Sequence, residues 1–236
     1  TIEGDSPLQG TATISWQIGL YSDTTGWPSV GTYHEGRLWV AGRAEAFTNR
    51  VDGSFSNDPF NFKPTADDGT ISDANAVAAI FRAKENNVIL WMLSTDDGLM
   101  LGCQAGEWRI KASALDDPIS DTSIQARRVS TYGCADMQPA QPGGQTVFVQ
   151  RQQRRLLAHQ QLTSNKYSAS NLSQNAYHIT VTGIAEIMWQ QEPLLCVWAR
   201  RTDGKLLGCT YREREYSGYA VSKEPFNGWH RHFLGT

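Results

Sequence analysis

The residues with the clearest chemical potential are carboxylates in or near short polar segments. Asp96 and Asp97 stand together before a glycine, whereas Glu107 and Glu192 lie in separate parts of the chain. Hydrolysis of a glycosidic bond needs two carboxyl groups that converge on one sugar. Carboxylates this dispersed do not establish such a pair, so the sequence favours a protein without enzymatic activity.

The segment Ser94–Gly98 (STDDG) partly matches the Asp-box of sialidase-type propellers, S-x-D-x-G-x-T-W. The match ends after the glycine, where Leu99, Met100 and Leu101 replace the expected x-Thr-Trp. An Asp-box shapes a surface turn between strands. Even a complete match would therefore indicate a fold and not hydrolysis.

His230 and His232 are two residues apart, which places both rings on one face of a strand. Such a pair could bind a metal or act as a base. No carboxylate or cysteine stands at ligand spacing beside it, so surface histidines are the simpler interpretation.

The four cysteines are far apart and form no C-x-x-C pair. Zinc ligands cluster in sequence, so this spacing argues against a zinc site, and no cofactor is predicted. Buried free thiols are the expected state of Cys103, Cys134, Cys196 and Cys209.

Arginines form three clusters beside predicted turns. Arginine binds phosphate groups well, so the clusters are candidate contacts to DNA or to a protein partner. Ion pairs with another protein, or plain solvated loop ends, fit the clusters equally well. The candidates are Arg127, Arg128, Arg151, Arg154, Arg155, Arg200 and Arg201.

The two halves of the chain carry opposite charge. Residues 1–120 contain 8 basic and 16 acidic residues, and residues 121–236 contain 13 and 8. This asymmetry suits head-to-tail contact between copies of the chain, or one end of the molecule meeting a different partner. Solvated loops alone would explain it as well.

Two similar segments are the clearest predicted strands among the elements that must position these residues. VILWMLSTDDGLMLGC (Val88–Cys103) and LLCVWARRTDGKLLGC (Leu194–Cys209) each place two apolar runs around Asp-Gly. Asp and Gly tolerate the positive φ of a tight turn, so both segments are predicted β-hairpins. With the Asp-Gly pairs aligned, Trp91 falls opposite Val197 and Trp198 opposite Met92. One copy then needs a bulge, or the two tryptophans have different roles.

The glycines of the two copies are 106 residues apart, so a unit of half that length predicts further hairpins near residues 151 and 45. Two apolar runs flank residue 151, and one apolar run closed by a glycine, Gly36–Gly42, precedes residue 45. A period of roughly 40 to 50 residues with a few strands in each unit indicates a β-propeller. Generic hairpins in a β-sandwich are the alternative.

We therefore predict an all-β, β-propeller-like domain of about four to five blades over residues 14–236, preceded by an N-terminal arm over residues 1–13. The exception is an Ala-rich segment, Asp73–Arg82, which is the best helix candidate, with Ser72 or Asp73 as its cap; because it is short, an edge strand is the alternative. Residues 44–70 are expected to form a long loop pinned by phenylalanines. Trp91→Ala and Trp198→Ala should each unfold the domain.

No run of 18 apolar residues is present, so no membrane segment is predicted. The chain starts without Met and stops just after an aromatic segment. We expect it to be a fragment of a longer protein.

From end to end the chain resembles the tail nozzle family of short-tailed bacteriophages, also described as tail tubular protein B-like. The order and spacing of several pieces over about residues 28–232 carry the resemblance. These pieces are Pro28–Val30, Gly36–Gly42, Asn61–Phe62, Asn87–Trp91, Gly106–Trp108, Arg127–Arg128, Ser130–Cys134, Phe148–Arg151, Trp189–Pro193, Asp203–Gly204, Thr210–Arg212, Arg214 and Gly228–His232.

The resemblance implies a structural virion protein of the phage tail, assembled in the host bacterial cytoplasm. Copies would form a ring below the adaptor and portal proteins, with transient contact to exiting DNA and no active site. The alternative is a carbohydrate-active or glycan-binding propeller that recognises surface sugars.

Overall fold

The computed structural model describes residues 20–42, 47–66, 69–81, 87–114, 117–163, 166–212, 215–217, 220–223 and 226–233. The strands of these residues form four antiparallel sheets that follow one another in chain order and one separate two-stranded hairpin, and no helix occurs among them. The predicted all-β class is confirmed. The predicted arm, residues 1–13, lies outside the described residues.

Sheet 1 comprises β1 (Val30–His34), β2 (Arg37–Ala41), β3 (Arg50–Gly53) and β4 (Val77–Ile80). Sheet 2 comprises β5 (Ile89–Thr95), β6 (Gly98–Cys103), β7 (Gly106–Ala112) and β8 (Ile124–Arg128). Sheet 3 comprises β9 (Thr146–Val149), β10 (Leu156–Thr163) and β11 (Lys166–Asn171).

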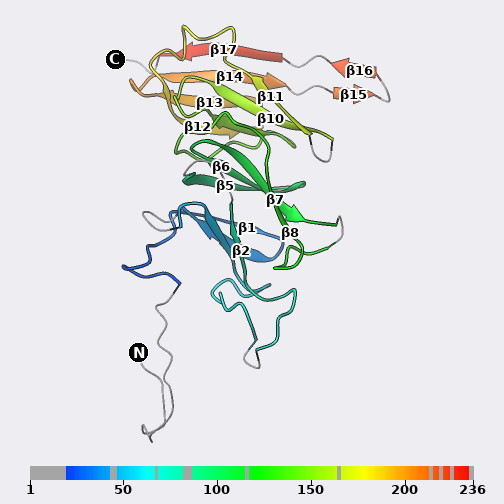
Figure 1. The fold of residues 1–236 in the computed structure, drawn as a ribbon. Coiled ribbons are helices and arrows are strands. Elements are labelled where there is room, and N and C mark those ends of the chain that lie inside the picture. Colours follow the sequence, from blue (N-terminus) through cyan, green and yellow to red (C-terminus); the bar gives the residue numbers. More distant parts are fainter. Residues whose placement is uncertain are drawn as a thin grey trace, which may run out of the picture.

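Sheet 4 comprises β12 (Ile184–Gln190), β13 (Cys196–Arg201), β14 (Leu206–Arg212) and β17 (Phe226–His232). Between its last two strands the chain forms a separate hairpin, β15 (Glu215–Ser217) and β16 (Ala220–Lys223). Figure 1 shows the four sheets stacked in order from sheet 1 to sheet 4, with the small hairpin extending to one side.

Two of the three interfaces between neighbouring sheets are apolar. Alternate residues of a strand point to opposite faces, so each inner sheet divides its side chains between two neighbours. Between sheets 1 and 2, Phe81 stacks on Trp108 with ring centroids 5.2 Å apart. Between sheets 3 and 4, Val149 and Val197 belong to one buried cluster. The four cysteines are free and buried, as predicted.

The interface between sheets 2 and 3 has the smallest apolar cluster of the three. Its buried members are Trp91, Met100, Cys134, Phe148 and Leu157. The remaining contact surface contains charged and polar side chains. This interface therefore differs chemically from the other two.

All four predicted hairpins are present. β5 pairs with β6, β13 with β14 and β9 with β10, and β2 pairs with β3 around residue 45. Gly98 and Gly204 adopt φ values of 119° and 83°, as an Asp-Gly turn requires. The repeat inferred from the 106-residue separation of Gly98 and Gly204 is wrong, however, because the two hairpins do not occupy equivalent places in their sheets. β5 and β6 are the first two strands of sheet 2, whereas β13 and β14 are the second and third strands of sheet 4.

Turn length explains the one-residue slip between the two tryptophans. In the first hairpin Thr95 pairs with Gly98 across a two-residue turn. In the second, Arg201 N–H donates to the Lys205 carbonyl at 2.9 Å, so the loop has one more residue. The extra residue shifts the register, and each tryptophan ends opposite a glycine: Trp91 faces Gly102 and Trp198 faces Gly208.

The surroundings of these two tryptophans nevertheless differ. Trp91 is fully buried, which confirms its core assignment. Trp198 is only half-buried and contacts His230 and His232, so its assignment to the core is wrong.

The predicted helix over Asp73–Arg82 is wrong and the edge-strand alternative is confirmed, because the centre of the segment is strand β4 at the edge of sheet 1. Val77 and Ala79 are buried while Ala78 and Ile80 are exposed, which is the period of a strand. Pairing with β3 overrides the helix propensity of the alanines. The proposed cap, Ser72, instead donates its backbone N–H to Asn75 Oδ1 at 2.9 Å in a local turn.

The predicted loop over residues 44–70 contains strand β3, so it is shorter than expected. Phenylalanines do not pin it throughout, since Phe60 is 91% exposed and Phe47 is also exposed. Phe62 does pack edge-on against Tyr21. The stronger restraint is buried Arg37, whose guanidinium donates to the carbonyls of Ser54 at 2.6 Å and Asn75 at 2.7 Å.

Candidate functional site

One end of the stack, which we call the acidic end, contains the turns β1–β2 and β5–β6. His34 Nδ1 lies 2.9 Å from Ser94 Oγ, which joins these two turns. The backbone N–H of Ile119 donates to Glu35 Oε2 at 3.3 Å, which brings residues 117–121 to the same place. The exposed carboxylates here are Glu35, Asp96, Asp117 and Asp121.

The opposite end, which we call the basic end, contains the turns β9–β10 and β13–β14, the last residues of β8 and the residues that follow them. Arg151 N–H donates to the Gly133 carbonyl at 3.0 Å, and Thr180 Oγ1 donates to the Arg154 carbonyl at 2.9 Å. These bonds hold three segments of the chain together. The arginines exposed in this region are Arg127, Arg128, Arg151, Arg154 and Arg155.

Arg155 and its neighbours surround a shallow hollow at the basic end. The guanidinium carbon of Arg155 lies 5.8 Å from the ring centroid of Tyr177. Arg154, Gln150 and Gln152 line the same hollow. A cation beside an aromatic ring and two amides forms a surface suited to anions and to planar groups.

The other two candidate arginines do not join this free basic surface. Arg200 is exposed but pairs with Glu186, with Nε 3.1 Å from Oε2. The side chain of Arg201 is only 7% exposed, and it forms a two-bond ion pair with Asp203. Its Nη1 also donates to the Ile179 carbonyl at 3.0 Å. The proposal of Arg201 as a contact residue is therefore wrong, because its charge stabilises the β13–β14 turn.

A buried charge network crosses the interface between sheets 2 and 3 near the acidic end. Arg109 on β7 forms an ion pair with Asp97, and the hydroxyl of Tyr167 on β11 donates to the same carboxylate. Arg109 also donates to the Tyr167 oxygen at 3.1 Å. Burial, with a smaller effect of Asp97, raises the pKa of Tyr167. The network joins the β5–β6 turn to sheet 3.

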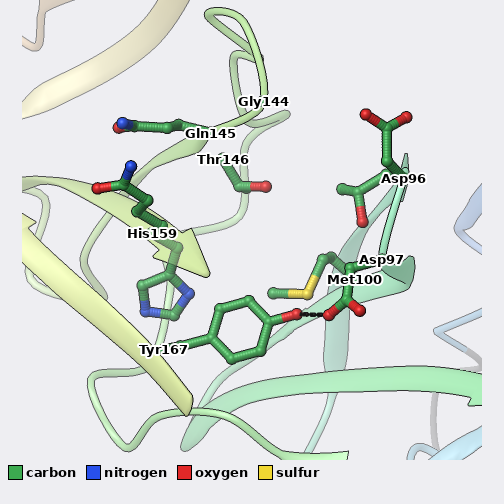
Figure 2. A pocket seen from close by; sticks show the side chains of 10 residues that line it. Asp96, Asp97, Met100, Gly144, Gln145, Thr146, His159 and Tyr167 are labelled. Atoms are coloured by element: carbon green, nitrogen blue, oxygen red, sulfur yellow. Dashed lines mark hydrogen bonds between the residues drawn. The ribbon is translucent and has the colours of Figure 1, made fainter. Parts of the chain in front are cut away.

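Beside this network lies a polar hollow of about 250 Å³. Figure 2 shows Asp96 and Asp97 on one side, Gln145 and Thr146 on the other, and His159 next to Tyr167. Asp97 already binds Arg109 and Tyr167, while Asp96 projects freely from the turn.

Glu107 lies deep in the same interface, toward the basic end. It is fully buried, faces Gly102 across the strands and accepts a hydrogen bond from the Ser130 hydroxyl. Burial raises the pKa of Glu107 to about 7. Its surroundings make it a structural group and not a partner for Asp96 or Asp97.

The predicted carboxylates thus do not converge. Asp96 and Asp97 share one turn, Glu107 is buried along β7, and Glu192 is exposed in the loop between β12 and β13. The two rings of His230 and His232 do share one face, with Nδ1 and Nε2 2.6 Å apart. Within the described residues, no group of three metal-ligating side chains is found.

Sequence reasoning missed Arg109, His159 and Tyr167. Arg109 is a cation directly between Trp108 and Ile110 in the strand GEWRIKA, and a cation among large apolar side chains needs a partner. That signal could have identified the network. His159 and Tyr167 carried no comparable signal, because only the stacking of sheet 3 on sheet 2 brings them to the site.

Compared with known proteins, the chain matches no protein-family model and no curated protein. Among the described residues there is no helix that could span a membrane.

Proposed function

We propose that this protein is a structural component of the virion tail of a short-tailed phage, part of a nozzle ring through which DNA is ejected. The observation that carries the proposal is the basic end, which presents five exposed arginines from two separate segments, the end of β8 and the β9–β10 turn. Phosphate contacts of this type are independent of base sequence. That property suits a conduit through which an entire genome passes.

The sheet architecture also supports a scaffold. The sheets follow one another in chain order and stack through buried side chains, as propeller blades do. The propeller-like arrangement of about four to five blades belongs to this proposal. The separation of acidic and basic ends would orient neighbouring copies, and adaptor or portal-proximal proteins, along one axis.

Negative-stain images of the full-length protein test the assembly. Rings with a central channel are expected. A protein that stays monomeric at high concentration contradicts the nozzle.

A salt series tests the DNA contact. Binding to random-sequence duplex DNA should weaken with salt, and each phosphate contact adds about 0.9 to the slope of log K against log salt. Replacing Arg151, Arg154 and Arg155 together by Gln should lower that slope by about 2 to 3. Arg212→Gln, which removes an exposed charge from the far end of β14, is the control and should leave the slope unchanged. Equal slopes for the triple variant and the wild type would exclude the basic end as the DNA surface.

A further inference from the structure

The hollow between the β5–β6 turn and sheet 3 contains a buried polar side chain that the protein leaves unsatisfied. His159 is 3% exposed, and neither ring nitrogen has a hydrogen-bond partner among the described residues. The ring packs edge-on against Phe148, with centroids 4.9 Å apart, so its position is fixed. Buried polar groups in proteins are nearly always paired, and an unpaired one requires a physical reason.

The protonation state of His159 defines what could pair with it. Burial lowers the pKa of His159 to about 4. Near neutral pH the imidazole is therefore uncharged, with one nitrogen that donates and one that accepts. A partner that both donates and accepts hydrogen bonds matches this ring.

The other lining groups have the same mixed character. Asp96 can only accept, Thr146 can donate and accept, and the amide of Gln160 offers both functions. Gln145 accepts a hydrogen bond from the Tyr211 hydroxyl through Oε1, which leaves its amide nitrogen to act as a donor.

Three classes of ligand fit this hollow poorly. Asp96 and Asp97 repel a phosphate or another anion. Arg109 and Tyr167 already bind Asp97, and the described residues hold no set of three ligands for a divalent cation. An apolar molecule would leave the polar lining unpaired.

We propose that this hollow binds a neutral cyclic polyol, namely one hexose unit of a glycan. Sugar hydroxyls both donate and accept, so they can pair with His159, Asp96 and the amides together. A volume of about 250 Å³ admits one such ring. The site does not depend on the proposed nozzle function, since a structural protein can carry it.

Saturation-transfer difference NMR on the full chain tests the site. The probes are methyl glycosides of glucose, galactose, mannose and N-acetylglucosamine at millimolar concentration and pH 7. At least one glycoside should receive saturation from the wild-type protein. Binding should persist from pH 6 to pH 8 and weaken as the pH falls toward 4, where His159 gains a proton.

Two variants separate the site from general stability. His159→Phe keeps the packing against Phe148 and removes both nitrogens, and Asp96→Asn alters an exposed carboxylate without a structural role. Each should weaken binding at least tenfold. The control, Thr131→Val, changes a second hollow that also includes His159 and Tyr167, and it should bind as the wild type does.

The absence of saturation transfer to all four glycosides overturns the proposal. Binding that survives both His159→Phe and Asp96→Asn, or that is lost in Thr131→Val, overturns the location. Neither result bears on ring assembly, so this proposal and the nozzle proposal fail separately.

Discussion

Two rows of side chains in this molecule share one pattern but differ in what covers them. In sheet 2, Gly102 lies between Trp91 and Glu107 on the neighbouring strands. In sheet 4, Gly208 lies between Trp198 and His230 in the same way. Sheet 3 covers the first row. The second row faces outward beside Met188, which is 66% exposed.

The glycine has the same local role in both rows. A Cβ on Gly102 would lie 2.0 Å from Trp91 Cε2, and one on Gly208 would lie 2.0 Å from His230 Cε1. Each glycine therefore lets a neighbouring ring lie flat over the strand. The pattern is a property of strand pairing, and its energetic value depends on the layer above it.

The largest expected effect comes from Trp91→Ala. The side chain is fully buried between sheets 2 and 3, so its removal leaves a cavity under Phe148 and should cost about 3 to 5 kcal/mol of unfolding free energy. Urea denaturation followed by far-UV circular dichroism measures the loss. Trp198→Ala is the matched control, and it should cost about 1 kcal/mol because its ring is partly hydrated already. Equal losses would show that sheet 4 is covered in solution as sheet 2 is.

The next effect is a pH dependence due to Glu107. Its folded pKa, about 7, lies above the unfolded value, so its contribution to stability is complete below about pH 4.5 and is lost as pH rises through 7. The loss has an upper limit of roughly 3 kcal/mol, from 1.36 kcal/mol per pKa unit. The lowered pKa of His159 adds an opposite trend, so the quantity to measure is the denaturation midpoint of the wild type minus that of a Glu107→Gln variant, and this difference should fall from pH 4 to pH 8.

Glu107→Gln provides the control for this pH series. The amide keeps the size of the side chain and cannot ionise, so the variant should lack the fall that Glu107 causes and keep the trend that His159 causes. A difference between the wild type and the variant that rises with pH contradicts the buried position of Glu107.

The sequence predicts much of this architecture, because its signals are local. The hairpins at Gly98 and Gly204 follow from Asp-Gly turns and flanking apolar runs, and the all-β class follows from strand periodicity. The errors arise where contacts between distant segments decide. Pairing with β3 makes residues 77–80 a strand, and the covering by sheet 3 gives Trp91 and Trp198 different environments.

The same distinction applies to the candidate sites. The arginine clusters could be found from the sequence, yet only the structure shows that five of the seven arginines are exposed at one end. Arg201 was misassigned because Asp203, two residues away, neutralises it within the turn. His159 and Tyr167 join the polar hollow only through sheet stacking, which no local pattern encodes.

The smallest effects compare the two glycines directly. Gly102→Ala places a methyl group against Trp91, which has no room to move under Phe148, so the variant should lose about 1 to 3 kcal/mol. Gly208→Ala meets the far end of His230, whose ring can swing toward solvent, so its loss should stay below about 1 kcal/mol. Urea midpoints of both variants, measured with the wild type under identical conditions, give the difference. A loss for Gly208→Ala as large as that for Gly102→Ala would mean that His230 is held rigidly. The outer face of sheet 4 would then be packed like the interface between sheets 2 and 3.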